Sequence, residues 1–115
     1  MATPVFSLKR SKDGQYYFNL HAANNEIILT SRRYRMRGVA VNAIVMVKDN
    51  ALVDQHYERL PTGDQHYFVL RSGDGQILGT SERYTTRAAR DKGIEAVKRC
   101  APEAEIREVE GELDA

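Results

Sequence analysis

Hydrophobic and polar residues alternate in three short segments near the start of the chain, which is the pattern of β-strands with one buried face. These segments span residues 5–9, 16–22 and 27–32. Lys12-Asp13-Gly14 separates the first two, and Asn24-Asn25 separates the last two. Residues of these types tolerate positive φ, so we expect tight turns at both places, with a type I′ hairpin turn at Asn24-Asn25.

The same order of segments occurs a second time, displaced by 50 residues. Residues 15–20 align with residues 65–70, Asp74-Gly75 takes the place of Asn24-Asn25, and a third strand is expected at 77–82. Residues with an identical counterpart 50 positions later are Ile27, Thr30, Ser31, Arg33, Tyr34, Arg37, Ile44, Val47 and Lys48. Self-similarity at one fixed period is typical of a duplicated structural unit, and two copies can each cover the apolar face of the other.

The segment after the third strand is ambiguous in repeat one. Residues 39–47 are rich in β-branched side chains and alone would fit a strand. In repeat two, residues 87–98 contain helix formers after Thr85-Thr86, with Ile94 and Val97 at helical spacing. Because the repeat relates the two segments, we expect a helix in both.

Each repeat then ends in another strand-like stretch, at 53–59 and 104–109, and the first of these would run on into the opening strand of repeat two. The predicted fold is α+β, with tandem β-β-β-α-β repeats that form one antiparallel sheet. Two helices pack on one face of this sheet, and a pseudo-twofold axis relates the halves. We expect one domain over residues 1–115, with repeat one at 4–55, repeat two at 56–109 and an acidic tail at 110–115.

The two faces of the predicted sheet differ in character. A turn at Asn24-Asn25 places Leu20 opposite Leu29 on the face that meets the helices. It also places Ala22 opposite Ile27 on that face. The reverse face is a candidate binding surface, although strand alternation produces such a face whether or not a ligand binds. It carries Tyr17, Asn19, His21, Ile28, Thr30 and Arg32 in repeat one and Tyr67, Val69, Arg71, Leu78, Thr80 and Glu82 in repeat two.

Arginine stands next to tyrosine where the third strand leads into the helix, as Arg33-Tyr34 in repeat one and Arg83-Tyr84 in repeat two, with Arg32 beside the first pair. Arginine and tyrosine together can hold a phosphate and stack a base, so weak binding of single-stranded nucleic acid is one alternative. Tyrosine packed against the arginine stem at an exposed corner is the plainer explanation.

The two expected helices differ on one stripe. Repeat one carries Val41 and Val45 where repeat two carries Asp91 and Glu95. Both valines should project away from the core, and exposed apolar residues in a row suggest contact with a second copy or with another protein. A deeper position of the first helix within the domain is the competing explanation.

Composition narrows the class of protein. The chain has 115 residues, 42% hydrophobic and 29% charged, as in an ordinary globular domain. It shows no signal-peptide pattern and no apolar run of membrane-spanning length, and Cys100 is its single cysteine, so we expect a cytoplasmic protein. Residues 102–115 hold six acids and one base, which leaves 16 bases and 10 acids elsewhere. This acidic end either aids solubility or competes with an acidic partner for the basic body.

Known catalytic and metal-binding patterns are not apparent. His21, His56 and His66 are far apart and have no cysteine at ligand spacing. Cys100 lies near the end of an expected helix, where the helix dipole disfavours a thiolate, so we expect a buried, inert thiol. Gly73-Asp74-Gly75 lies in a hairpin turn rather than between a strand and a helix, unlike a phosphate loop. We therefore expect no catalytic residues, no metal and no cofactor.

With its repeat and motifs established, the chain resembles the YegP-like family of small bacterial proteins of unknown function. The segments that carry the likeness are residues 14–20 and 27–31 in repeat one and residues 67–70, 77–84 and 92–98 in repeat two. The resemblance implies tandem β3-α-β units that share one sheet and exchange terminal strands, and single-repeat relatives that pair as dimers. It implies no catalytic residue and no activity. Repeat one departs from the pattern at Ala43, which replaces the helix glycine found at Gly93.

The sequence therefore predicts a non-enzymatic binding or protein-association module whose partner is itself or another protein, with no membrane contact. Weak nucleic-acid binding is the first alternative, and an enzyme acting on a small molecule is the second.

Overall fold

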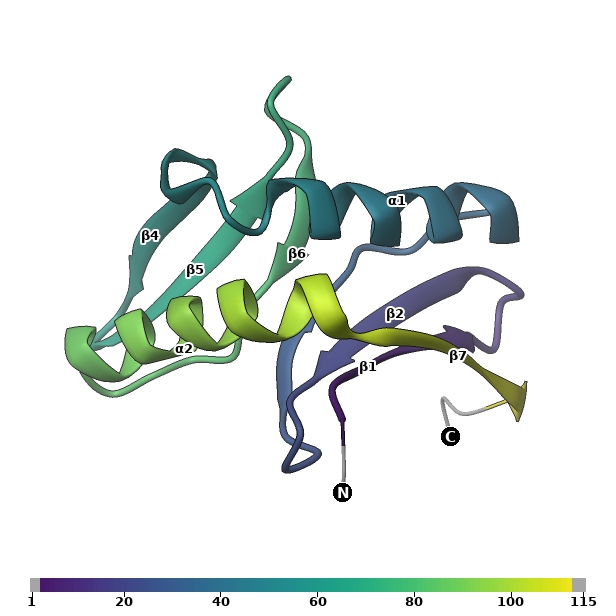
Figure 1. Ribbon diagram of the computed structural model, residues 1–115, viewed down its shortest axis with the longest axis horizontal. Helices are drawn as coiled ribbons and strands as arrows, with labels where there is room; N and C mark the ends of the chain where they lie inside the picture. Colours follow the sequence, from purple (N-terminus) through teal and green to yellow (C-terminus); the bar gives the residue numbers. More distant parts are fainter. Residues whose placement is uncertain (1–2, 113–115) are drawn as a thin grey trace.

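The computed structural model describes residues 3–112, with side chains through residue 109. The chain forms two β-β-β-α units and a final strand (Figure 1), whereas the prediction gave each repeat a closing strand after its helix. Repeat one comprises β1 (Val5–Arg10), β2 (Tyr16–His21), β3 (Ile27–Thr30) and α1 (Arg37–Asn50). Repeat two comprises β4 (Tyr57–Thr62), β5 (Gln65–Arg71), β6 (Ile77–Thr80) and α2 (Arg87–Cys100), and β7 (Glu105–Glu112) follows.

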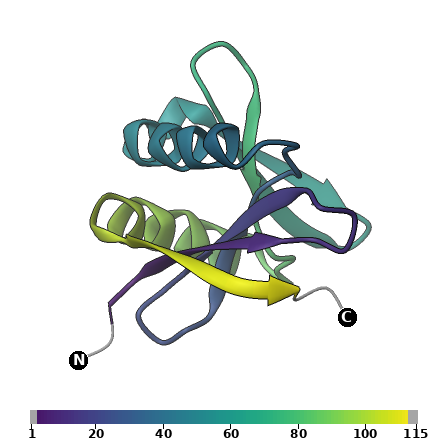
Figure 2. The same ribbon diagram turned by 90° about the vertical axis from the view of Figure 1, so that its right-hand side faces the viewer.

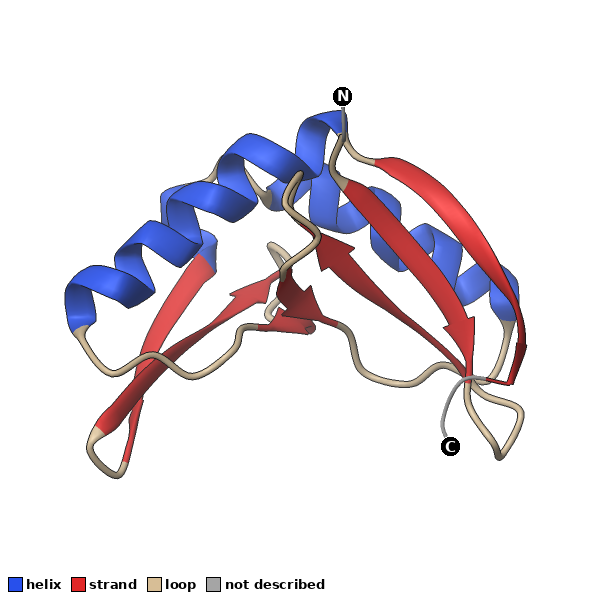
Figure 3. Ribbon diagram, turned by 90° about the horizontal axis from the view of Figure 1, so that it is seen from below, coloured by secondary structure: helices blue, strands red, loops and turns tan. Residues whose placement is uncertain are grey.

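The strands form one sheet in the order β4-β5-β6-β3-β2-β1-β7. The two repeats meet between β6 and β3, where Thr30 pairs with Thr80, its equivalent in the other repeat. The pseudo-twofold axis passes through this junction. Both helices lie on one side of the sheet, which bends into an arch beneath them (Figure 3). The predicted α+β architecture, with two helices on one face and pseudo-twofold symmetry, is confirmed.

The final strand, β7, follows repeat two in the sequence but completes the sheet of repeat one. It runs parallel to β1, with Phe6 opposite Ile106 and Ser7 opposite Arg107 (Figure 2). The prediction of a purely antiparallel sheet is therefore wrong at this edge. Parallel neighbours need a long connection, and almost the whole chain separates β1 from β7, with α2 leading into β7. This crossing is the exchange of a terminal strand between halves that the family resemblance implied.

The connection between the repeats differs from the expected strand at 53–59. One turn of 3-10 helix, Asp54–His56, stands between α1 and β4, so the strand begins only at Tyr57. The Tyr57 hydroxyl donates a hydrogen bond of 2.7 Å to the Ala51 carbonyl oxygen, which holds the connection against the end of α1. Because residues 54–56 form this helical turn, β4 does not extend backwards, and the described part of the chain contains no strand that serves both halves.

The hairpin turns also differ in type from the prediction. Asn25 has φ of 72° and Gly75 has φ of 92°, whereas their preceding residues do not have positive φ. A type I′ turn needs two such residues, so these loops are instead longer turns with one left-handed residue at the end. The result is a shifted register, in which His21 rather than Ala22 is opposite Ile27.

This shift creates a β-bulge that turns one more side chain of each third strand into the core. Leu20 is opposite Leu29 as predicted, and Ile28 is the extra residue of the bulge. Adjacent residues of a bulge can point to one side of the sheet, and Ile28 and Leu29 are both buried. The same shift buries Leu78 in β6. The assignment of Ile28 and Leu78 to the reverse face is therefore wrong.

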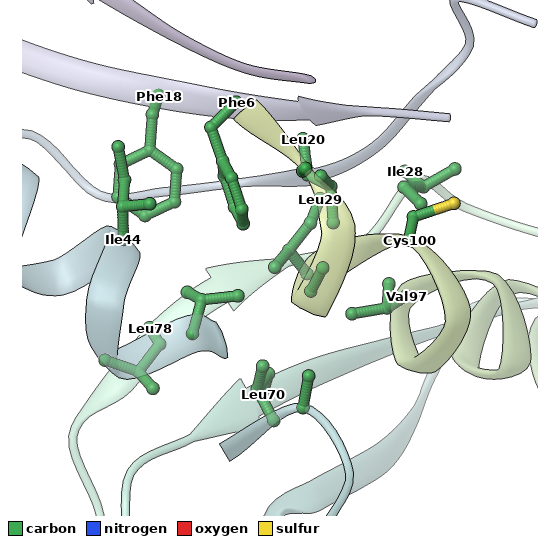
Figure 4. Close-up of a cluster of buried hydrophobic side chains, with 14 of the residues drawn as sticks. Phe6, Phe18, Leu20, Ile28, Leu29, Ile44, Leu70, Leu78, Val97 and Cys100 are labelled. Carbon is green, nitrogen blue, oxygen red and sulfur yellow. The ribbon is translucent and has the colours of Figure 1, made fainter. Parts of the chain in front are cut away.

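The hydrophobic core draws side chains from both repeats and from both helices (Figure 4). Leu29 meets Gly79, its equivalent in repeat two, near the pseudo-twofold axis. A Cβ atom added at Gly79 would lie 2.6 Å from Leu29 Cγ. The bulk of one residue thus fills the space left by the other.

Both predicted helices form. The Thr86 hydroxyl caps α2 and accepts a hydrogen bond of 3.0 Å from the Ala89 N–H. α1 has no side-chain cap at Met36, so its β-branched sequence depends on packing, which buries Ile44 and Val47 completely. Within residues 3–112, neither helix has the length and apolar character needed to cross a membrane.

Candidate functional site

The reverse face of the sheet is not one continuous binding surface. Asn19 and Val69 are buried there (5% and 4% exposed), because neighbouring side chains cover them. Asn19 accepts a hydrogen bond of 2.7 Å from Lys9 Nζ and donates one of 2.9 Å to the Thr30 hydroxyl. At the centre of each repeat, side chains of the protein therefore cover this face and leave no room for a ligand to contact Asn19 or Val69.

The arginine–tyrosine corners are partly structural. Tyr34 and Tyr84 are half-buried, and their backbones pair with Tyr16 and His66 across isolated bridges. Burial raises the pKa of both tyrosine hydroxyls above the ordinary value. Neither ring is presented as a free stacking platform. This favours the packing explanation for the two tyrosines.

The arginines of these corners are exposed, and Arg33 stacks on a tyrosine ring of β2. The Arg33 guanidinium lies 5.2 Å from the centre of the Tyr17 ring, a cation–π contact within repeat one. Tyr67, the equivalent of Tyr17, is half-buried on β5, and Arg83 is exposed. The structure thus brings Arg33 and Tyr17 together, whereas nucleic-acid binding stays a prediction.

A hollow of about 540 Å³ lies at the junction of the repeats. It is bordered by Arg32 and Ile77 and by hydroxyl residues of both third strands. The Ser31 and Ser81 hydroxyls are already used, because each accepts from a backbone N–H and donates to a backbone carbonyl. Thr30 and Ser31 recur as Thr80 and Ser81 for structural reasons. The two threonines pair β3 with β6, and each serine hydroxyl accepts from a backbone N–H of the second strand of its repeat.

A second hollow, of about 430 Å³, lies on the reverse face of repeat one. His21 borders it together with Ser7 of β1 and Arg107 of β7. Of these three residues, strand alternation predicted only His21. Ser7 is brought near it by the pairing of β1 with β2, and Arg107 by the parallel pairing of β7 with β1. The equivalent of His21, Arg71, instead forms an ion pair of 2.8 Å with Glu58.

The structure exposes only one of the two valines of the apolar stripe predicted on α1. Val45 is 44% exposed, whereas Val41 is half-buried and packs against the core, so its expected outward projection is wrong. Val41 lies on the flank of α1 that approaches the crossover to β7, where Lys48 Nζ donates to the Ala104 carbonyl oxygen. Val39, which we had not named, is 48% exposed.

Groups with metal-binding or nucleophilic potential do not gather into a site. Among residues 3–112, no three histidine, cysteine or acidic side chains converge to hold a metal ion. Cys100 is buried as expected, and desolvation raises the pKa of its thiol. A buried thiol with a raised pKa is a poor nucleophile.

Comparison with known proteins places the chain in a family. The family model for a domain of unknown function, DUF1508, matches residues 11–58 and again residues 62–108. A UPF0339 protein of Pseudomonas aeruginosa is 42% identical over 100 residues, which cover 86% of this chain and 91% of that protein. A UPF0339 protein of Bordetella pertussis is 48% identical over 100 residues, which cover 86% and 89%.

Two solved structures share the whole arrangement. The solution structure of YegP from E. coli, a protein of unknown function, matches with a TM-score of 0.90 at 32% identity and covers 98% of both chains. That of a UPF0339 protein from Shewanella oneidensis matches with a TM-score of 0.87 at 34% identity, covering 92% of this chain and 91% of that one. The chain therefore belongs to the DUF1508 family of YegP-like UPF0339 proteins, a family of unknown function.

Proposed function

We propose that this protein is a non-enzymatic association module of the cytoplasm that pairs with a second copy of itself through the exposed side of α1. The observation that carries the proposal is the contrast between α1 and α2. Both helices have 14 residues and cover the same sheet. At equivalent places α1 exposes Val39 and Val45, whereas α2 has Ala89 and Glu95.

The fold itself does not require valine at these places. α2 packs on the sheet with Glu95 in the position that Val45 takes on α1. An exposed apolar pair that its own internal repeat does without supports a role in contact with another molecule. Met36 and Leu52, which are 66% and 68% exposed, extend the apolar character beyond both ends of α1.

The charges along α1 favour a second copy over an unrelated partner. Arg35 lies before the helix and Asp49 near its end, and among the described residues neither forms an ion pair. In an antiparallel pair of helices with Asn42 on the twofold axis, Arg35 of one copy would face Asp49 of the other. The same register brings Val39 to Val45, and the helix dipoles oppose each other favourably.

Cytoplasmic location is supported by the cysteine content. The single thiol, Cys100, is buried and leaves the chain without an internal disulfide. Secreted domains of this size are often stabilised by disulfides, whereas cytoplasmic proteins seldom are.

Sedimentation velocity over a range of protein concentrations tests the proposal. A single helix pair buries less than the roughly 800 Å² per partner of a standard stable interface, so we expect a dissociation constant of roughly tens of micromolar. Val45→Glu, which copies α2, should give a monomer with unchanged circular dichroism. The matched change Glu95→Gln on α2 should leave the dimer intact.

Charge reversal identifies the partner as a second copy. Arg35→Glu alone should weaken the dimer, and Arg35→Glu combined with Asp49→Arg should restore it, because both contacts are then reversed together. A protein that stays monomeric at several times this concentration, or a dimer that Val45→Glu leaves unchanged, would contradict the proposal.

A further inference from the structure

We propose that repeat one binds a small oxyanion, a carboxylate or phosphate group, in the hollow bordered by Ser7, His21 and Arg107. This hollow has a volume of about 430 Å³ and lies between β1, β7 and the turn after β2. It opens on the face of the sheet away from the helices. The site is therefore separate from the association surface on α1 and does not depend on it.

His21 has one nitrogen occupied and one without a partner. Nδ1 lies 3.3 Å from the Asn25 carbonyl oxygen, and because a carbonyl only accepts, Nδ1 carries the proton. Nε2 is buried and has no hydrogen-bond partner among the described residues. Leaving a buried polar atom unpaired is costly, and such an atom in a native fold calls for an explanation.

Repeat two shows which chemical group pairs with the side chain at the position equivalent to His21. Glu58 is opposite Val69 and Ser7 is opposite Asn19, so Glu58 and Ser7 are equivalent, as are Arg71 and His21. Arg71 donates one hydrogen bond of 2.8 Å to the Gly75 carbonyl oxygen, as His21 does to Asn25.

The second contact of Arg71 is the informative one. Its guanidinium donates a hydrogen bond of 2.8 Å to the Glu58 carboxylate. In repeat one a serine takes the place of that glutamate, so the carboxylate is missing, and His21 Nε2 donates to an oxyanion when the ring is protonated on both nitrogens. A bound oxyanion would supply the group that repeat two provides from its own chain.

Arg107 of β7 brings a positive charge to the hollow. It stands opposite Ser7 in the parallel pair of β1 and β7, is exposed, and forms no ion pair with a described residue. Repeat two has no counterpart because β4 is the edge of the sheet. The Ser7 hydroxyl also has no side-chain partner among the described residues and can donate to the same anion.

Access to the histidine nitrogen requires a small movement. The His21 ring is half-buried and Nε2 itself is shielded from solvent. An oxyanion would first contact Arg107 and Ser7 and reach Nε2 as the ring turns toward the hollow. Glu105 lies on the same side of β7 two residues before Arg107, and its charge limits the affinity for anions.

The test is a titration with inorganic phosphate and, separately, with acetate at constant ionic strength, followed by NMR. We expect saturable shifts of the His21 ring and the Ser7 and Arg107 amide signals at roughly millimolar ligand, since a few charge-assisted contacts give weak binding. Stronger binding of phosphate assigns a phosphate ligand, and equal or stronger binding of acetate assigns a carboxylate. No saturable shift with either ion overturns the proposal.

Variants make the test specific to this site. Arg107→Gln should weaken binding by about tenfold, because it removes a charge-assisted contact. Ser7→Glu combined with His21→Arg closes the hollow with the ion pair of repeat two and should abolish binding. Arg87→Gln, which removes an exposed arginine elsewhere, should leave the affinity unchanged, and Glu105→Gln should raise it. Equal shifts in the wild type and in Arg107→Gln overturn the proposal even if the double variant does not fold.

Discussion

Three buried places in the fold hold different residues in the two repeats, although the backbone follows the same path. The pairs are Phe6 and Tyr57, Leu29 and Gly79, and Ala43 and Gly93. At each place one repeat carries more atoms, and a neighbour accommodates them. The space at Gly93 is filled by Tyr84 and Phe68 of the same repeat, whereas Gly79 lies against Leu29 of the other repeat. At the contact of Leu29 with Gly79 the two repeats are therefore complementary rather than identical.

The largest expected effect comes from adding bulk at Gly79. Gly79→Leu would place a second leucine against Leu29, whose Cγ would lie 2.6 Å from the new Cβ. We expect a loss of about 3 kcal/mol in the free energy of unfolding, as for other overpacked cores. Urea denaturation measures it. Gly73→Ala, at a turn where an added Cβ meets nothing within 4 Å, is the control.

Exchanging the two residues sharpens this test. Leu29→Gly combined with Gly79→Leu moves the bulk across the pseudo-twofold axis and should recover much of the stability lost in Gly79→Leu alone. If the double variant were no more stable than the single one, the complementarity of the pair would be refuted.

A smaller effect is expected at Tyr57, whose counterpart is Phe6. Tyr57→Phe leaves the Ala51 carbonyl oxygen without its hydrogen bond and should cost about 1 kcal/mol at neutral pH. Burial raises the pKa of Tyr57 above its ordinary value of about 10. Folding therefore favours the protonated phenol, and this contribution to stability is complete below pH 10 and is lost as the pH rises above it.

Alkaline denaturation curves measure this pH dependence. The raised pKa values of Tyr34 and Tyr84 contribute to the same loss, so Tyr57→Phe should flatten the decline above pH 10 without removing it. A variant with an unchanged alkaline slope would show that Tyr57 titrates in the folded state as it does in the unfolded chain.

The smallest effect is expected at Gly93. An added Cβ would lie 2.5 Å from the Tyr84 hydroxyl oxygen and 3.2 Å from Phe68 Cε2. Alanine improves the helix by about 1 kcal/mol relative to glycine, which offsets much of the clash. We expect Gly93→Ala to lower the free energy of unfolding by about 1 kcal/mol at most.

Thermal denaturation of two further variants makes this comparison. Ala43→Gly in α1 should destabilise through helix propensity and lost packing, since Ala43 is already accommodated. Tyr84→Phe should rescue Gly93→Ala in part, and a failure to do so would place the strain elsewhere.

The sequence predicted where the two candidate surfaces lie, but it did not predict all the residues that form them. The repeat predicted Val45 as exposed because its equivalent, Glu95, is charged. The repeat could not predict that Val41 packs against the core. That packing depends on how closely the crossover to β7 approaches α1. His21 was named from strand alternation. Ser7 and Arg107 were not, because they are separated from it along the chain and meet only where β7 joins β1.

The sequence by itself determined the duplication, the type and order of the main elements and the identity of most core residues, because each follows from local periodicity or from comparison of the two repeats. Only the tertiary structure decided the bulges and the parallel edge. A single extra residue at Ile28 reverses the alternation that sequence patterns rely on. The pairing of β1 with β7 joins residues about 100 positions apart, and no local pattern specifies such a contact.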